Sequence, residues 1–172
     1  GEAGGQVGDR GEIVGPSGKL VIEETLKLPG NLFVHVGTVA EGKLAVGDPV
    51  HLKVEEELSQ DTQRNHTATH ILHAVLRRVL GDHVKQSGSH VAPDRLRFDF
   101  THFAALTPDE IAEIERLVNV EIRRNHDLQV HEMDLEEALK TGAMALFEEK
   151  YGDRVRLVEI PGFNRELCGG TH

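Results

Sequence analysis

The chain has 172 residues, of which 38% are hydrophobic, enough for one ordinary core or two small ones. Its formal net charge of −10 argues against broad, sequence-independent nucleic-acid binding, because such binding needs a basic surface that displaces phosphate counterions. Only 4% of the residues are aromatic and Trp is absent, so extended base-stacking platforms are not expected. Any RNA contact must therefore be local.

A single cysteine excludes a disulfide within the chain, and no apolar run is long enough to span a membrane or to resemble a secretory signal. We therefore expect a cytoplasmic protein that contacts no membrane. The chain begins with Gly1 and ends on a candidate metal ligand, His172, so we expect it to be a fragment of something longer.

The first third of the chain is predicted to consist of strands and turns. Alternating apolar or β-branched residues cover Lys19–Thr25, Leu32–Val39 and Val50–Val54, and turns rich in Gly and Pro separate them. This spacing is typical of a small all-β barrel. We expect such a barrel over residues 1–58.

A helix is predicted from Asp61 to Leu80, after the acidic stretch 55–57, with Gly81 closing it. One face carries apolar side chains, namely Ala68, Leu72, Val75 and Val79. His66, His70 and His73 lie nearly opposite. The histidines must therefore face either water or a second surface of the protein.

Strands and helices are interleaved in the rest of the chain. Thr107, Pro108 and Glu110 form a capping box that opens a long helix, and Asp134 is expected to cap a short helix ending at Lys140. The predicted strands are 84–91, 96–100, 128–133 and 154–160. This order predicts an α+β protein, with a two-layer α/β domain and an antiparallel sheet over residues 59–172.

Four residues are candidate ligands of a transition metal: His66, His70, Cys168 and His172. They form two pairs with the same i, i+4 spacing, and imidazole nitrogen and thiolate sulfur are donors that Zn²⁺ prefers. The alternative is that both helical histidines are solvated and Cys168 only fills space. His73 is either a competing ligand or a partner of the ligands.

Four protein ligands leave the role of the metal open. Structural zinc sites are closed by four protein ligands, whereas catalytic sites keep a position for water or substrate. Either one ligand such as Cys168 or His172 is displaced, or the coordination expands, or the ion only shapes the site.

Three further segments carry candidate binding residues. Gly5 and Gln6 follow another glycine, which allows close approach of the backbone to a ligand or merely a turn. The segment 86–89, which begins with Gln86, can recognise a small polar group or form a strand with a bulge. Thr67 lies either beside the metal or on the helix surface. The arginine pairs at 77–78 and 123–124 are most simply solvated helix faces.

In several stretches the sequence resembles the editing-domain family of alanyl-tRNA synthetases and its freestanding trans-editing relatives. The matching segments are 4–11, 64–70, 86–89, 97–100, 142–147 and 168–172. They cover nearly the whole chain in order. The related domain of threonyl-tRNA synthetase has the same paired spacing, but Arg97–Phe100 and Gly142–Phe147 favour the alanyl type.

The resemblance implies a β-barrel beside an α/β editing domain that hydrolyses seryl- or glycyl-tRNA(Ala). It implies that His66, His70, Cys168 and His172 bind Zn²⁺, with the first three taking part in catalysis, and that Gln86 lines the amino-acid pocket. We assign Thr67, Gly5 and Gln6 to substrate binding as well. The expected partner is the acceptor end of mischarged tRNA(Ala); ATP and alanine would be bound only by an aminoacylation domain that this chain lacks. The oligomeric state is not predicted.

Hydrolysis of mischarged tRNA is a second selection against the wrong amino acid, after its attachment, and there is a physical reason for it. Serine differs from alanine by one hydroxyl, and a pocket that hydrogen-bonds this group rejects the analogue lacking it by roughly 10⁴ to 10⁵. Gln86 and Thr67 are the candidates for that recognition. No carboxylate stands out as a general base, so the terminal ribose hydroxyl of the tRNA is a candidate for assisting the reaction. Two other functions remain open: a freestanding trans-editing deacylase, and a tRNA-docking module with a purely structural zinc.

Overall fold

The computed structural model describes residues 4–30, 32–144 and 152–172, which form nine strands and three helices. In chain order they are β1 (Gly11–Gly15), β2 (Gly18–Leu28), β3 (Leu32–Gly42), β4 (His51–Val54), α1 (Glu56–Leu80), β5 (Gln86–Val91), β6 (Leu96–Phe100), α2 (Pro108–Arg124), β7 (Gln129–Asp134), α3 (Leu135–Lys140), β8 (Arg154–Ile160) and β9 (Asn164–Leu167). The strands belong to separate antiparallel sheets, which confirms a mixed α+β architecture.

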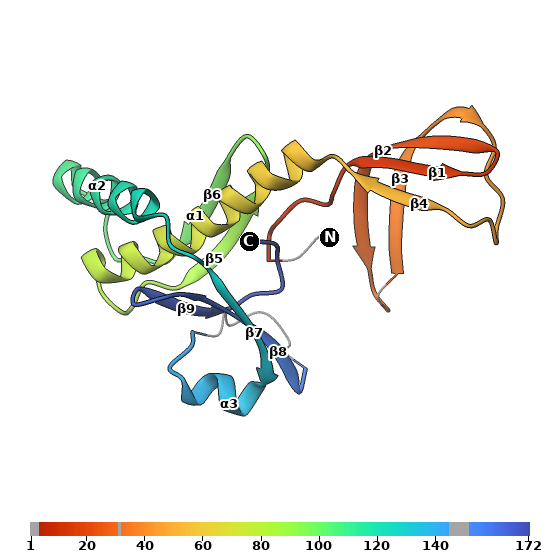
Figure 1. Cartoon of the computed structure of the whole chain (residues 1–172). Helices are drawn as coiled ribbons and strands as arrows, with labels where there is room; N and C mark the ends of the chain where they lie inside the picture. The colour runs from red at the N-terminus through yellow and green to blue at the C-terminus, as the bar shows by residue number, and fades with distance from the viewer. Residues whose placement is uncertain (1–3, 31, 145–151) are drawn as a thin grey trace.

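The first sheet has the strand order β3-β2-β1-β4 and projects away from the rest of the molecule at the start of α1 (Figure 1). A closed barrel requires its two outermost strands to pair, but in the described residues β4 pairs with β1 and β3 pairs with β2. The expected barrel is therefore not confirmed. The register places Ile13 opposite both Leu20 and Leu52, so apolar side chains share one face of the open sheet.

Helix α1 runs through the centre of the molecule and begins at Glu56, five residues before the predicted start. Gly81 ends it as predicted, with its N–H bonded to the carbonyl oxygen of Arg77. The helix packs against α2 around a core that includes Ile71, Val75 and Ile114. Its histidine face is also buried, because β9 and the residues after it cover that face.

Strands β5 and β6 form a hairpin against α1. A register shift between Gln86 and Gly88 confirms that the predicted binding segment contains a bulge, and β5 begins at Gln86 rather than at 84. The capping box of α2 is present as predicted, with Thr107 and Glu110 bonded reciprocally.

The third sheet, β7-β8-β9, packs with α3 around a second core that includes Ala138, Leu157 and Leu167. Strand β9 was not predicted, because the last strand expected from the sequence ends at residue 160. The described residues of the second half of the chain thus form two small antiparallel sheets rather than the single one expected. Asp134 occupies the N-cap position of α3, but its side chain makes no capping hydrogen bond.

The described N-terminal segment leaves the first sheet and lies beside β5. Gln6 forms an isolated bridge with Val91, and Val7 N–H bonds to the carbonyl oxygen of Val91 at 2.9 Å. The first described residues lie close to the C-terminal segment, because Thr171 N–H and its hydroxyl donate to Gln6 Oε1 (Figure 1). The domain boundary between residues 58 and 59 stays a prediction. None of the helices in the described part of the chain is long and apolar enough to cross a membrane.

Candidate metal centre

The four predicted ligands come together: one donor atom each from His66, His70, Cys168 and His172 lies within 4.8 Å of the other three. His66 and His70 are one turn apart on α1, and Cys168 and His172 belong to the segment after β9. His66, His70 and Cys168 are buried, with exposed fractions of 2, 6 and 4%. Their burial excludes the alternative in which the helical histidines are solvated.

Each imidazole of the set contacts a protein partner through its Nδ1 atom, which leaves Nε2 as the atom that can coordinate a metal. Nδ1 of His66 lies 2.8 Å from Gln6 Oε1, Nδ1 of His70 contacts the Glu166 carboxylate, and Nδ1 of His172 lies 3.3 Å from Thr67 Oγ1. Such partners fix the tautomer and the ring orientation of a metal-ligating histidine.

The unpartnered atoms fit a metal site. Among the described residues, the buried side-chain nitrogens and oxygens without a hydrogen-bond partner are Nε2 of His70, His73 and His172. Two of these three belong to the four-residue set, and a buried polar atom without a partner is costly. Three nitrogens and a sulfur, with no carboxylate oxygen among them, suit a borderline-soft ion. The cluster can therefore hold a metal ion.

Hydrogen bonds around Cys168 favour the thiolate, which is the form that binds metals. Burial raises the pKa of this thiol, but contacts with His172, His66 and His70 outweigh it and lower the pKa to about 3. The backbone N–H of Gly170 also points to the sulfur at 3.4 Å. Cys168 thus presents a negative charge to a cation.

Glu166 is a candidate functional residue that the sequence analysis missed. It is 2% exposed, and its carboxylate accepts hydrogen bonds from His70 Nδ1, from His73 Nδ1 at 2.9 Å and from Asn164 Nδ2 at 2.9 Å. Burial raises the pKa of Glu166, but the two imidazoles hold it well below its usual range. The available signal was the i, i+2 spacing to Cys168, which places both side chains on one side of an extended segment.

The charge of Glu166 acts on His70. Burial lowers the pKa of this imidazole, but Glu166 and Cys168 raise it to about 10. Burial dominates at His172 and lowers its pKa. His73 shares Glu166 with His70, so in this structure it lies beside the ligand set as a partner of the same carboxylate.

The predicted binding residues lie on two sides of the cluster. Gln86 Nε2 donates to Ser89 Oγ at 3.1 Å, and Ser89 Oγ donates to the carbonyl oxygen of Gly4 at 3.2 Å. A Cβ on Gly4 would lie 3.5 Å from His66 and 3.6 Å from the sulfur of Cys168. Gln86 is thus connected to the cluster through Ser89 and Gly4, on the β5 side.

Gly5, Gln6 and Thr67 take different positions. Gly5 has a φ of +79°, and a Cβ there would clash with Ser89 at 2.2 Å, so the close backbone approach requires glycine. Gln6 is 2% exposed, and its side-chain oxygen also accepts from N–H and O–H of Thr171. Thr67 lies on the opposite side, against His172.

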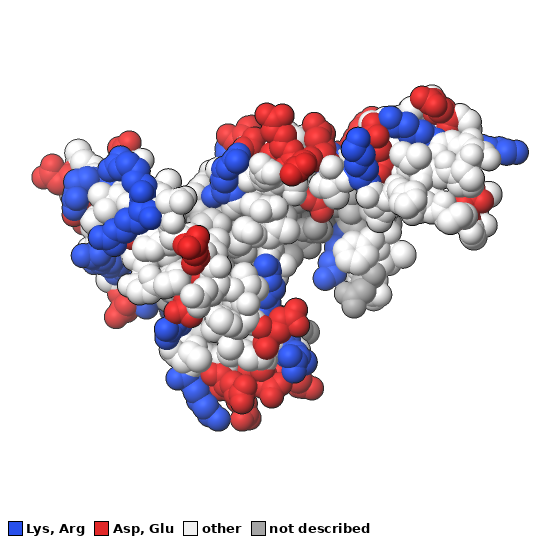
Figure 2. Space-filling model, in the orientation of Figure 1, with Lys and Arg blue, Asp and Glu red and all other residues white. Residues whose placement is uncertain are grey.

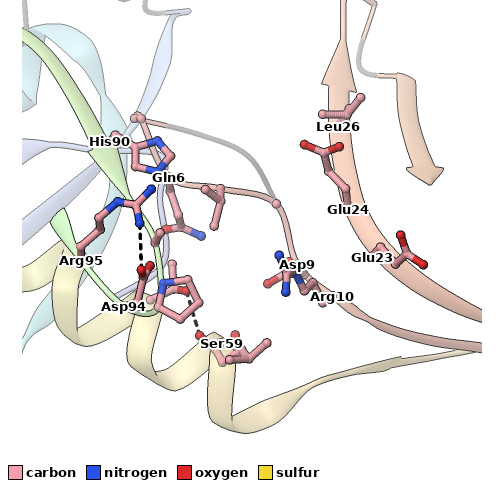
Figure 3. A pocket seen from close by; sticks show the side chains of 18 of the residues that line it. Gln6, Asp9, Arg10, Glu23, Glu24, Leu26, Ser59, His90, Asp94 and Arg95 are labelled. Atoms are coloured by element: carbon pink, nitrogen blue, oxygen red, sulfur yellow. Dashed lines mark hydrogen bonds and ion pairs between the residues drawn. The ribbon is translucent and has the colours of Figure 1, made fainter. Parts of the chain in front are cut away.

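Two cavities lie near the cluster. The larger, about 1240 Å³, lies between the first sheet and the β5–β6 hairpin and is lined by Gly4, Gln6 and Ser89 among others (Figure 3). The smaller, about 520 Å³, lies between α1 and the end of α2, and Thr67 and His172 line it. A molecule in the smaller cavity would lie next to His172, whereas the larger cavity is lined by Gln6, which contacts His66, and by none of the four candidate ligands.

Comparison with known proteins points to one group of enzymes. A family profile described as "tRNA synthetases class II (A)" matches residues 1–58. The chain is 54% identical over 171 residues to the alanine–tRNA ligases of Xanthomonas axonopodis pv. citri and Xanthomonas euvesicatoria pv. vesicatoria, and 53% identical to that of Xanthomonas campestris pv. campestris. These matches cover 99% of the chain and 19% of each ligase. Of the segment Gly142–Phe147, which contributed to the resemblance, residues 145–147 lie outside the described residues.

Proposed function

The chain is homologous, over 99% of its length, to a segment of the alanine–tRNA ligases, and from this premise we propose that it is their editing segment. It hydrolyses the ester that joins a wrong amino acid, serine or glycine, to the tRNA for alanine. The observation that supports this proposal most strongly is the largely buried cluster of His66, His70, Cys168 and His172, whose last member lines the smaller cavity.

We assign Zn²⁺ to this cluster, since three imidazole nitrogens and a thiolate are its usual ligands. When bound, the ion supplies positive charge to an ester carbonyl and makes nearby water more acidic. The residues of the chain orient the donors: Gln6 and Glu166 hold Nδ1 of His66 and His70, so that both Nε2 atoms point to one place.

Recognition of the wrong amino acid is assigned to the β5 side. There Ser89 lines the larger cavity, and Gln86 donates a hydrogen bond to its hydroxyl, so an amide and a hydroxyl lie side by side. A serine hydroxyl can bond both side chains in place of the hydrogen bond between them, so that no polar group is left unpaired. Alanine has no hydroxyl with which to do so. Thr67 remains the second candidate for this contact.

The decisive experiment measures deacylation of seryl-, glycyl- and alanyl-tRNA(Ala), with and without a chelator. We expect hydrolysis of the first two, little hydrolysis of the third, and loss of activity with chelator. Cys168→Ala should lower the rate at least 100-fold if removing a ligand removes the ion's contribution of about 3 kcal/mol or more. Val46→Ala, on a fully exposed side chain, is the folding-neutral control.

The ratio of the deacylation rates of seryl- and alanyl-tRNA tests the pocket independently of the metal. Gln86→Ala should narrow the ratio of the seryl to the alanyl rate, because the pocket loses a polar partner. An unchanged ratio would remove Gln86 from recognition without affecting the metal assignment.

A second candidate function is a tRNA-docking module with structural zinc, which the four-ligand set favours because such sites are usually closed. Turnover separates the two. A docking module binds the charged tRNA and leaves the ester intact, with or without the ion.

A further inference from the structure

His83 and His102 form a further pair of imidazoles, outside the four-residue cluster. Nε2 of His83 lies 2.8 Å from Nδ1 of His102. The two rings are stacked, with their centroids 5.1 Å apart and an angle of 23° between their planes. Both residues are only partly buried, so solvent and small ions can reach them. Nothing in the proposed function uses this pair.

The loop between α1 and β5 holds His83 from both sides. Nη1 of Arg77 donates hydrogen bonds to the carbonyl oxygens of Asp82 at 2.8 Å and of Val84 at 3.0 Å. Arg77 also pairs with the Asp82 carboxylate at 2.9 Å, which balances its charge. Val84 is fully buried, and its N–H bonds to the carbonyl oxygen of Gly81 at 3.2 Å. The residues on either side of His83 are therefore fixed, which lowers the entropy cost of placing its ring on a ligand.

His102 is held at the open end of the β5–β6 hairpin. The N–H of Thr101 bonds to the carbonyl oxygen of Lys85 at 3.0 Å, and the N–H of Lys85 bonds to Thr101 Oγ1 at 3.3 Å. These bonds continue the strand pairing beyond β5 and β6 and bring the flanking histidines together. Phe103 stacks on the other face of the pair, with its centroid 4.3 Å from that of His83. Both imidazoles are thus positioned by the surrounding structure.

Two facing imidazole nitrogens can share a proton or chelate a metal ion. When both rings are neutral, one donates its N–H to the bare nitrogen of the other. When a metal ion binds, the donating ring carries its proton on its opposite nitrogen instead, and both facing lone pairs become available. The exchange needs only a change of tautomer, and no proton has to leave the pair.

The separation of the two nitrogens favours one type of ion. Metal–nitrogen bonds of about 2.0 Å that meet at about 90° place two nitrogens about 2.8 Å apart, whereas a tetrahedral angle places them about 3.3 Å apart. The 2.8 Å between His83 and His102 therefore fits an ion with 90° angles better than tetrahedral Zn²⁺. Among ions that nitrogen ligands bind, Ni²⁺ and Cu²⁺ have this geometry.

The charges around the pair suit a cation. Hydrogen bonds from Thr107 lower the pKa of Glu110, and the nearby charge of His102 lowers it further, so this carboxylate lies close to the pair. Lys and Arg side chains gather over α2 in Figure 2, but Arg123 and Arg124 belong to its last turn, whereas Glu110 belongs to its first. A helix of 17 residues separates its two ends by about 25 Å. The end of α2 near His102 is therefore the acidic one.

We propose that His83 and His102 chelate one divalent transition-metal ion of the Ni²⁺ or Cu²⁺ type, with water completing its coordination. Among the residues that the structure describes, only the four-residue cluster gathers three or more candidate donors, so the chain supplies two ligands here. With two protein ligands, we expect a Kd of about 10 µM, within an order of magnitude. The bound ion joins the two strands at the open end of the hairpin, close in the chain to Gln86.

The direct test is a calorimetric titration of the zinc-loaded chain with Ni²⁺, with the zinc content measured before and after. His102→Gln and His83→Gln each remove one ligand, and His51→Gln, which removes an exposed histidine from β4, is the matched control. We expect one Ni²⁺ per chain in the parent and in His51→Gln, and binding at least tenfold weaker in both pair variants. Equal affinity in the pair variants, or no binding at about 100 times the expected Kd, would overturn the proposal.

Two further measurements place the ion. Ni²⁺ bound at the pair should broaden the amide signals of Asp82, Val84 and Phe103 in NMR spectra. Broadening centred on Gly170 and Thr171, with release of zinc, would place the ion at the cluster and refute the pair as its site.

Thermal unfolding provides a check that does not depend on NMR. At about 100 times the Kd, Ni²⁺ should raise the Tm of the parent and of His51→Gln by about 5 to 10 °C, because an ion that binds only the folded chain stabilises it. The pair variants should show little of this shift, and an equal shift in all four chains would contradict the assignment. These tests need no turnover, so their outcome is independent of the proposed function.

Discussion

Gln6 Oε1 lies 2.8 Å from Nδ1 of His66, although the two residues are 60 positions apart in the chain. The same oxygen accepts hydrogen bonds from the backbone N–H of Thr171 at 3.0 Å and from its hydroxyl at 2.9 Å. One buried amide oxygen therefore joins the N-terminal segment, α1 and the C-terminal segment at the candidate metal centre. We infer that Gln6 acts as a positioning residue for His66.

Gln6→Ala should lower the Zn²⁺ affinity by about 10- to 100-fold, because His66 Nδ1 and both Thr171 donors lose their acceptor. Gln6→Glu keeps an oxygen acceptor and should restore most of that affinity. Competition with a chromogenic chelator measures both. If Gln6→Ala leaves the affinity unchanged, the contact with His66 does not position the ligand.

Glu166→Gln should also weaken Zn²⁺ binding by about 10- to 100-fold, since an amide cannot accept from three donors as a carboxylate does. Asn164→Ala, which removes only one donor to this carboxylate, is the matched milder change and should cost less. Metal affinity and near-ultraviolet spectra of the Co²⁺-substituted chain provide the readout. Equal affinities for Glu166→Gln and the parent chain would contradict the role assigned to Glu166.

His73→Phe should leave one metal ion per chain, because His73 lies outside the four-donor set although its Nε2 is buried without a partner. The ring has room beside Phe98, whose centroid lies 5.2 Å away. Metal content after dialysis distinguishes the two roles considered for His73. A loss as complete as that in Cys168→Ala would make His73 a ligand.

Gly170→Ala should displace His66, since a Cβ at this position would lie 2.0 Å from the Cε1 atom of that ring. The change should lower the metal content. It should also lower the free energy of unfolding by about 1 to 3 kcal/mol, the usual range for overpacking. Gly152→Ala is the control, because the nearest atom to its Cβ is 4.0 Å away. Metal analysis and denaturant unfolding of both variants test this prediction. Equal metal content and equal stability of the two variants would contradict it.

Metal binding at neutral pH should release about one proton, because His70 with a pKa of about 10 is protonated there while Cys168, with a pKa of about 3, is already a thiolate. Raising the pH toward 10 removes the His70 proton that competes with the metal, so the metal affinity should increase with pH. Calorimetry in buffers of different ionisation enthalpy measures the release. Glu166→Ala should reduce it, because Glu166 raises the pKa of His70; an affinity that falls as the pH rises would be the contrary result.

Part of this site was predictable because it depends on local geometry. The i, i+4 spacing places His66 and His70 on one helix face whatever the rest of the chain does, and the capping box at Thr107 depends on only four residues. The chemistry of the donor set also follows from residue types alone. The sequence therefore determined the candidate ligands, the end of α1 at Gly81 and the α+β class.

The rest depends on contacts between distant residues. Glu166 binds His70 across 96 positions and Gln6 binds Thr171 across 165, and no local spacing contains such pairings. Strand β9 and the open edge of the first sheet were mispredicted for the same reason, since strand pairing is a long-range property. Only the tertiary structure decided that the histidine face of α1 meets β9 instead of water, because burial of a polar face becomes favourable only when another segment supplies its hydrogen-bond partners.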